Sequence, residues 1–151
     1  MQFRDFRPAD FAGLCAIDQV CFPPGISYPP QILALWMREG GAFVVVAEDE
    51  AETLAGFVLA RPIGRNRGHI VTIEVLPRHR RGGAATELME RAHARLRGLG
   101  ASQVELETSV ENAAAIVFFE RLGYRKTGRI PRYYLDRIDA FRMIKGLEPG
   151  S

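Results

Sequence analysis

The sequence has 151 residues, of which 47% are hydrophobic and 25% are charged, and its formal net charge is +2. These values suit one globular domain and exclude disordered, collagen-like and low-complexity chains. So small a charge excess predicts no general affinity for nucleic acid. No apolar run reaches the roughly 20 residues of a membrane helix, and the first residues lack the apolar core of a signal peptide. We therefore expect a single cytoplasmic domain over residues 1–147 and a loose tail at 148–151, with no nucleic acid or membrane among its partners.

The cysteines and histidines show no metal-binding pattern. Cys15 and Cys21 are too few for a disulfide framework, and neither belongs to a CxxC motif or a Cys/His pair. His69, His79 and His93 lack ligand spacing. We therefore expect no metal, and we expect His93 to be inert on the polar face of a helix.

Hydrophobic periodicity and turn residues predict the elements of the first half. A helix that opens at Pro8-Ala9-Asp10 buries a stripe at helical spacing, and Pro29-Pro30 lets a second helix begin. The expected elements are a strand at 2–6, a helix to Cys21, a helix from Pro30 to about Arg38, and strands at 42–47, 54–63 and 70–75. The strands at 42–47 and 54–63 are expected to form a hairpin.

The second half predicts two helices and three strands. The first helix follows Gly82-Gly83, and its buried face is expected to hold Ala85, Leu88, Ala92, Leu96 and Leu99. The remaining elements are a strand at 104–108, a helix at 112–122, and strands at 125–130 and 139–145 that a Pro/Tyr-rich connection separates. This order predicts an α/β fold in which helices cover the faces of a mixed sheet.

The strand at 104–108 places two carboxylates on one side. Val104 and Leu106 alternate with Glu105 and Glu107. Because successive side chains of a strand point to opposite faces, the two glutamates share the face opposite the two apolar residues.

The segment from Val75 to Leu88 runs from a strand through a basic, glycine-rich turn into a helix. The first N–H groups of such a helix are unpaired and lie at the positive end of its dipole, which favours a phosphate. Gly82 and Gly83 would let a ligand approach the backbone, and the neighbouring arginines would add charge. A pyrophosphate fits this arrangement, although a simple turn with solvated arginines fits it equally well.

Two motifs resemble the GNAT N-acetyltransferase superfamily. Residues 80–85, Arg-Arg-Gly-Gly-Ala-Ala, resemble its R/Q-x-x-G-x-G/A coenzyme A signature, and residues 112–124 are similar to its N-x-x-A-x-x-x-Y-x-x-x-G-F helix. The resemblance covers essentially the whole chain. It implies a splayed central mixed sheet of about seven strands flanked by four helices, and acetyl-CoA as the acetyl donor.

The chain also resembles the ribosomal-protein-alanine N-acetyltransferases and related protein N-terminal acetyltransferases. The matching residues are Cys21-Phe22-Pro23 and the pattern of tyrosines, aspartates and Met143 over 133–143. This resemblance implies transfer to a primary amine, a protein N-terminal α-amine or a lysine, by a monomer or homodimer. Two alternatives stay open: acetylation of a small amine, such as a polyamine, amino acid or antibiotic, and a coenzyme-A-binding regulator with weak catalysis.

The resemblance implies roles for the donor site. Backbone groups of Ile73 and Val75 would pair with the pantetheine arm, and the Val75 N–H would stabilise the developing oxyanion. N–H groups of residues 81–86 would hold the pyrophosphate. The expected coenzyme-binding residues are Ile73, Val75, Arg80, Arg81, Gly82, Gly83, Ala84, Ala85, Thr86, Asn112 and Phe119.

Acetyl transfer also needs a base for the amine proton. Glu107 aligns with the strand carboxylate of the alanine-acetyltransferase subfamily and is the first candidate for the base. Glu74 is the second candidate, because other family members carry a base on the preceding strand. For each glutamate the alternative to a catalytic role is a carboxylate on a solvated strand face. Phe119 stands where the family has a tyrosine acid. A phenylalanine has no hydroxyl, so it cannot donate a proton. The resemblance implies that Tyr133 and Tyr134 hold the acceptor, and Tyr28 is a further candidate; for the first two, packing on a hairpin is an equal alternative.

Overall fold

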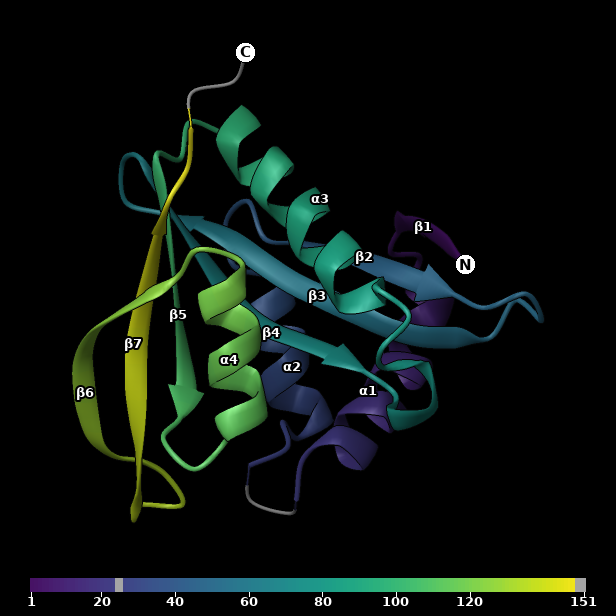
Figure 1. Ribbon diagram of the computed structural model, residues 1–151. Coiled ribbons are helices and arrows are strands. Elements are labelled where there is room, and N and C mark those ends of the chain that lie inside the picture. Colours follow the sequence, from purple (N-terminus) through teal and green to yellow (C-terminus); the bar gives the residue numbers. More distant parts are fainter. Residues whose placement is uncertain (24–25, 149–151) are drawn as a thin grey trace.

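A mixed sheet forms the centre of the computed structural model, which describes residues 1–23 and 26–148 (Figure 1). Within these residues the sheet has seven strands in the order β1-β2-β3-β4-β5-β7-β6. The strands are β1 (Gln2–Asp5), β2 (Phe43–Glu48), β3 (Leu54–Ile63), β4 (Arg67–Val75), β5 (Gln103–Ser109), β6 (Arg125–Tyr134) and β7 (Ile138–Gly146). β2 and β3 pair antiparallel, which confirms the expected hairpin.

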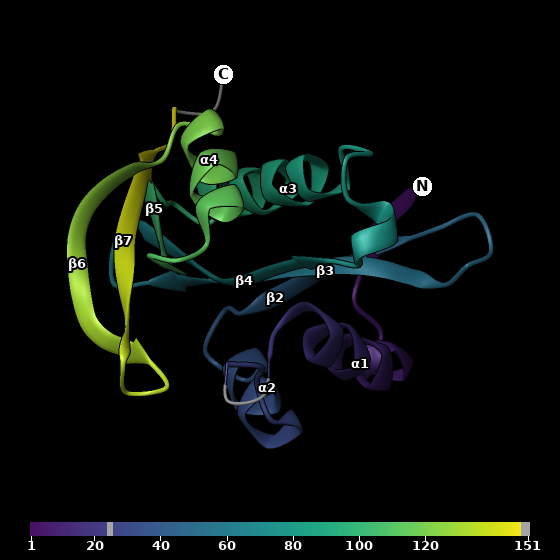
Figure 2. The same cartoon turned by 60° about the horizontal axis from the view of Figure 1, so that its bottom comes forward.

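Two helices cover each face of the sheet (Figure 2). α1 (Phe11–Cys21) and α2 (Pro30–Met37) pack on one face, and α3 (Ala84–Gly98) and α4 (Ala113–Arg121) pack on the other. Short 3-10 turns at Pro8–Asp10 and Pro77–His79 precede α1 and α3. The predicted arrangement of four helices around a mixed sheet is therefore confirmed. None of the helices in the described ranges has the length and apolar character needed to cross a membrane.

Each face of the sheet carries its own hydrophobic core. Val58 of β3 faces α3 and α4, whereas its neighbours Phe57 and Leu59 face α1 and α2. This alternation follows from the two-residue period of a strand. In α3 the buried stripe includes Leu88 and Leu96 as expected. Leu99 does not join it: the helix ends at Gly98 and the Leu99 side chain is 54% exposed, so this prediction was wrong.

The sheet opens between β4 and β5, its only parallel pair in the described part of the chain. These strands pair only over Arg67–Gln103, Gly68–Val104 and His69–Glu105. β4 begins at Arg67 and not at residue 70, because its first three residues pair with both β3 and β5. Leu59 of β3 pairs with Thr72 and Ala60 with Ile70, so Val71 is an extra residue that bends β4. Beyond this bulge the two strands separate, and this opening positions the site (Figure 1).

Two further expectations need correction. The Pro/Tyr-rich stretch is not a connection, because β6 continues through Pro131 to Tyr134 and pairs again at Tyr134–Ile138. β6 is an edge strand, where a missing proline N–H is tolerated. His93 is not on a polar face: it is 5% exposed, and its Nε2 lies 2.7 Å from the Tyr124 hydroxyl. The expected tail lies outside the described residues except for Glu148, which is exposed.

Candidate active site

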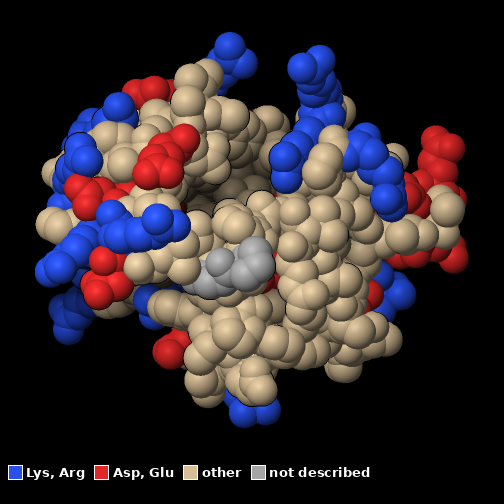
Figure 3. Space-filling model, turned by 90° about the horizontal axis from the view of Figure 1, so that it is seen from below, with Lys and Arg blue, Asp and Glu red and all other residues tan. Residues whose placement is uncertain are grey.

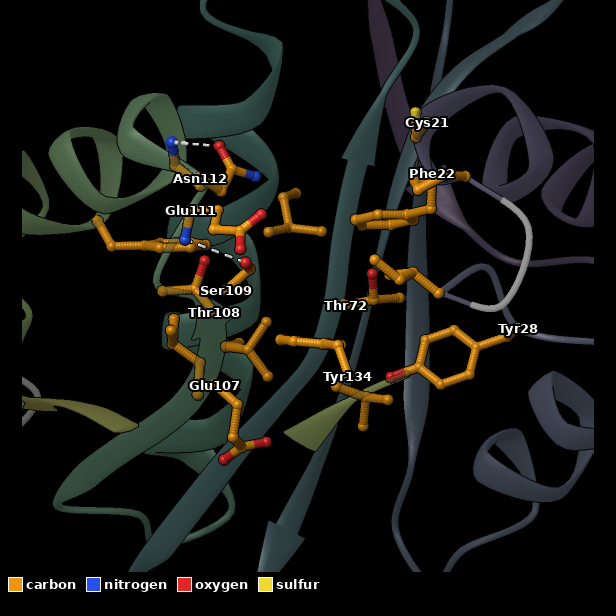
Figure 4. A pocket seen from close by; sticks show the side chains of 18 residues that line it. Cys21, Phe22, Tyr28, Thr72, Glu107, Thr108, Ser109, Glu111, Asn112 and Tyr134 are labelled. Carbon is orange, nitrogen blue, oxygen red and sulfur yellow. Dashed lines mark hydrogen bonds between the residues drawn. The ribbon is translucent and has the colours of Figure 1, made fainter. Parts of the chain in front are cut away.

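A cavity of about 370 Å³ lies where β4 and β5 separate. Figure 3 shows a hollow at the middle of this face, with mostly uncharged residues around it. Figure 4 shows the two walls: Glu107, Thr108 and Ser109 on the β5 side, and Cys21, Phe22, Tyr28 and Thr72 on the other. Tyr134 reaches the cavity from β6. Segments that are far apart in the sequence thus meet around one hollow.

Glu107 lies on the cavity wall, where two side chains contact it. Its Oε1 is 2.8 Å from His69 Nε2, and the Tyr133 hydroxyl donates to the same oxygen at 3.5 Å. His69 Nδ1 accepts from Arg61 Nε at 3.2 Å, so the ring proton of a neutral His69 lies on Nε2 and is donated to Glu107. As predicted, Glu107 points away from the side that holds the buried Val104 and Leu106.

The three tyrosines expected to hold the acceptor come together near Glu107. Tyr28 and Tyr134 line the cavity, and the Tyr133 ring packs edge-on against Tyr134 at 4.8 Å. Burial raises the pKa of all three phenols, and nearby phenols or the Glu107 carboxylate raise it further. The hydroxyls therefore keep their protons at neutral pH and are available as hydrogen-bond donors.

Glu74 lies apart from the cavity lining, on the face of β4 that α1 covers. Its side chain is 2% exposed, and Thr72 Oγ1 donates to its Oε2 at 2.7 Å. Burial, together with the neighbouring Asp18 carboxyl, raises the pKa of Glu74 well above its ordinary value. A group in this state holds a proton at neutral pH and is a poor acceptor of another.

The free edge of β4 can hold an extended ligand. The Leu76 N–H donates to Ala55 in β3, so the alternation of an antiparallel ladder turns the backbone groups of Ile73 and Val75 to the opposite edge. Consistent with this, the Val75 carbonyl accepts from Arg80 Nε at 2.9 Å instead of from β3. The Arg80 side chain is thus turned back toward β4 and not outward from the turn.

The start of α3 fits a phosphate group. Gly83 has a φ of 83°, in the left-handed region, and a Cβ placed on it would meet no atom within 4 Å. The first intrahelical bond runs from the Glu87 N–H to the Gly83 carbonyl, so the N–H groups of Ala84, Ala85 and Thr86 have no helical partner. Open space and unpaired donors at one helix end are what a pyrophosphate requires.

Asn112 and Phe119 close the cavity on the α4 side. Asn112 caps α4, as predicted, because its Oδ1 accepts from the Ala115 N–H at 3.1 Å. Phe119 lines the cavity and packs against Tyr124, with ring centroids 5.8 Å apart. Tyr124 is buried, as its predicted core role requires. Phe119 has no hydroxyl to present to the cavity, and the Tyr124 hydroxyl lies against His93 instead.

Sequence reasoning missed two polar residues of this region. His69 was assigned no role in the site from the sequence, yet its ring contacts Glu107. Asp18 was assigned no role from the sequence, yet it is fully buried beside Glu74. Asp18 is the one charged residue in the stretch 14–22, and this signal could have identified it.

A mixed sheet that opens between its parallel strands, a helix that begins with unpaired N–H groups, and a pocket at the opening that Glu107 lines are together typical of acyl-CoA-dependent transferases. Comparison with known proteins agrees with this. Residues 11–124 match the model of the acetyltransferase (GNAT) family. The N-alpha-acetyltransferase 30 of Schizosaccharomyces pombe is 32% identical over 120 residues, which cover 78% of this chain and 80% of that protein.

Two solved structures share the fold. The ribosomal-protein-S18-alanine N-acetyltransferase from Escherichia coli superposes with a TM-score of 0.86 at 22% identity, covering 99% of this chain and 96% of that one. Ard1 from Thermoplasma volcanium gives a TM-score of 0.86 at 26% identity, covering 97% of both chains. The chain belongs to the GNAT acetyltransferase family, and it is an N-acetyltransferase. Acetyltransferases of this family use acetyl-CoA.

Proposed function

We propose that this protein transfers the acetyl group of acetyl-CoA to the N-terminal α-amine of a protein or peptide. One observation carries the proposal: Glu107 lies on the wall of a cavity that Tyr28 and Tyr134 also line, at the opening between β4 and β5. A carboxylate and two phenol donors around one hollow suit an amine that is attached to a peptide backbone. The name of the fission-yeast relative, an N-alpha-acetyltransferase, supports the same acceptor.

Glu107 is the proposed general base. An N-terminal amine enters as an ammonium and must lose a proton before its nitrogen can attack a carbonyl carbon. The Glu107 carboxylate accepts that proton, directly or through a water molecule. The N–H of His69 holds one of its oxygens at 2.8 Å and thereby fixes the direction in which the other oxygen faces. His69 is in this account a positioning residue.

Tyr28 and Tyr134 are proposed to bind the backbone of the acceptor. Their hydroxyls stay protonated, because burial raises the pKa of both phenols, so each can donate a hydrogen bond to a peptide carbonyl. Tyr133 lies closer to the surface and contacts Glu107, which makes it part of the mouth of the pocket. A small amine has no peptide carbonyl, so it would use only some of these hydrogen-bond donors.

The donor side fits acetyl-CoA, which supplies a thioester activated for transfer. The N–H groups of residues 84–86 and the space above Gly83 would hold the pyrophosphate, and the free edge of β4 at Ile73 and Val75 would hold the pantetheine arm. The Val75 N–H is the proposed donor to the carbonyl oxygen as negative charge develops, a contribution of about 2.7–4 kcal/mol for one such donor. The residues proposed here require no metal.

Phe119 supplies no proton to the departing sulfur. It lies on the cavity wall, but its ring has no donor. A thiol has a pKa of about 8.5, so a thiolate leaves without a proton donor at a useful rate near neutral pH. We also propose a cytoplasmic location, which the two free thiols of Cys15 and Cys21 support, since disulfides are rare in that compartment.

The test is acetylation of three acceptors at equal concentration, followed by tandem mass spectrometry. The first peptide has a free N-terminus and no lysine, the second has a blocked N-terminus and one lysine, and the third acceptor is a polyamine. We expect rapid labelling of the first peptide at its α-amine. Preferred labelling of the lysine or the polyamine would contradict the proposed acceptor, and coenzyme binding without any transfer would indicate a regulator.

A further inference from the structure

Two carboxyl side chains face each other beneath the acceptor side of the pocket. Asp18 comes from α1 and Glu74 from β4, and their side chains are 0% and 2% exposed. The two carboxyls are near neighbours, and the Asp18 carboxyl contributes to the raised pKa of Glu74. Among the described residues neither forms a salt bridge with a lysine, arginine or histidine. A buried carboxylate without a cation is costly, and two adjacent ones are more so.

The hydrogen bonds of the pair leave one oxygen on each side unsatisfied. Asp18 Oδ2 accepts from the backbone N–H of Tyr28, and Glu74 Oε2 accepts from Thr72 Oγ1 at 2.7 Å. The other oxygens, Asp18 Oδ1 and Glu74 Oε1, are buried and meet no hydrogen-bond donor in the described ranges. Two such oxygens on neighbouring carboxyls satisfy each other only when one of the groups carries a proton.

The surroundings of the pair favour the shared proton. Cys15 and Cys21 of α1 and the phenol of Tyr28 are the titratable groups that face it, and burial raises the pKa of each, so all are uncharged at neutral pH. The Arg80 guanidinium, which lies close to Cys21, bonds Cys21 and the Val75 carbonyl and not the carboxyls. Burial and the Asp18 carboxyl both raise the pKa of Glu74, which favours its protonated form.

We propose that Asp18 and Glu74 share one proton, and that this acid pair is a positioning device that fastens the loop carrying Tyr28 onto β4. The pair joins three elements: α1 through Asp18, β4 through Glu74, and the loop through the Tyr28 N–H. Its effect on catalysis rests on the proposed role of Tyr28 in binding the acceptor. It also assigns Glu74 a role other than that of the base.

Loss of the shared proton would release the loop. With both groups ionised, the two carboxylates repel each other, and the Tyr28 backbone loses a fixed partner. The acceptor KM should then rise at alkaline pH while the acetyl-CoA KM stays constant, because the start of α3, which is proposed to hold the pyrophosphate, lies on the other face of the sheet from the pair. Glu74→Gln keeps an N–H donor toward Asp18 and an oxygen toward Thr72 but cannot titrate, so it should abolish the alkaline rise in acceptor KM. Glu74→Ala removes the donor and should raise the acceptor KM at all pH values.

Stability supplies a readout that does not depend on activity. A carboxyl whose pKa is raised by folding stabilises the protein fully below its unfolded pKa, and this contribution is lost as pH rises toward the folded value. The unfolding equilibrium should therefore shift toward the unfolded state in the wild type by up to about tenfold per pH unit above about pH 4.5. Glu74→Gln should lack this component.

The direct test is infrared spectroscopy of the wild-type protein and Glu74→Gln at neutral pH, with urea unfolding measured across pH 5–9. We expect the carbonyl stretch of a protonated carboxylic acid in the wild type and its loss in the variant. Absence of that band, or an identical pH dependence of unfolding in the two proteins, would overturn the shared proton. An unchanged acceptor KM in folded Glu74→Ala would overturn the positioning role. A protein that fails to acetylate peptides but shows the band would contradict the proposed function alone.

Discussion

The imidazole of His69 and the carboxylate of Glu107 join β4 and β5 at the point where these strands separate, with Nε2 and Oε1 2.8 Å apart. Two further side chains hold the ring: Arg61 donates to Nδ1, and Trp36 packs edge-on against it at 6.1 Å between centroids. The Arg61 guanidinium in turn lies over the Trp36 ring. Glu107 is thus oriented by a group that is itself fixed on its other side.

Replacing His69 should slow catalysis without weakening coenzyme binding. In His69→Ala the Glu107 carboxylate loses its donor and can rotate away from the acceptor. A misplaced catalytic group costs up to about 100-fold, so we expect kcat to fall by about 10- to 100-fold. His69→Gln, which can donate from its amide to the same oxygen, should restore part of the loss. Steady-state kinetics would contradict this role if His69→Ala had wild-type kcat.

The α3 start can be tested by substituting two glycines that both have positive φ. Gly83→Glu places a carboxylate at the proposed pyrophosphate site, so we expect coenzyme A binding at least about tenfold weaker, from charge repulsion. Gly100→Glu is the control, since Gly100 also has positive φ and open space but lies beyond the other end of α3. Calorimetry should show wild-type affinity in the control. Equal affinities of the two variants for coenzyme A would contradict the proposed pyrophosphate site.

Phe119→Tyr tests whether this position lacks only a proton donor. The variant adds a hydroxyl at a position on the cavity wall, and the ring packing against Tyr124 is kept. The resemblance implies a tyrosine acid at this position in the family. We expect coenzyme A affinity within about twofold of wild type and turnover at or above the wild-type rate. A large loss of coenzyme affinity in a folded variant would contradict the prediction, because it would mean that this position has no room for a tyrosine hydroxyl beside the pantetheine arm.

His93 makes stability depend on acidic pH. Burial, and then the charges of Lys145 and Arg97, lower the pKa of His93 to about 4. Because folding depresses this pKa, the folded state binds fewer protons than the unfolded one, so stability is complete above about pH 6.5 and falls as the pH drops toward 4. Between pH 7 and 5 the loss should be about 2 kcal/mol.

The matched variant is His93→Gln, whose amide can still bond the Tyr124 hydroxyl but does not titrate. Urea unfolding at pH 7 and pH 5 should show a smaller loss of stability in this variant than in the wild type. Equal losses in the two proteins would assign the acid sensitivity to other groups.

Local patterns were sufficient for most of the fold and for one wall of the site. The alternation around Glu107, the glycines before α3 and the cap at Asn112 are short-range features, and each was placed correctly. His69 and Asp18 could not be assigned from such patterns, since their partners lie 38 and 56 positions away in the sequence and the contacts exist only once β4 has paired.

The errors have a similar cause. His93 was assigned to a solvent-facing surface because helical periodicity does not reveal that Tyr124, from a later segment, covers it. Pro131 suggested a break because a proline is excluded from central strands, and the edge position of β6 is a property of the whole sheet. Strand order, and therefore which residues meet across the opening, is decided by tertiary packing.

The most direct test of the account compares kcat for acetylation of a free N-terminal peptide by the wild type, Glu107→Gln and Glu105→Gln. Glu105 lies on the same face of β5 but faces Arg67 at 3.6 Å instead of the cavity, so it controls for the loss of a carboxylate from this strand. A general base contributes about 10²- to 10⁴-fold, and we expect a loss of that size in Glu107→Gln alone, with acetyl-CoA affinity unchanged. Wild-type turnover in Glu107→Gln would contradict the assignment of Glu107 as the base.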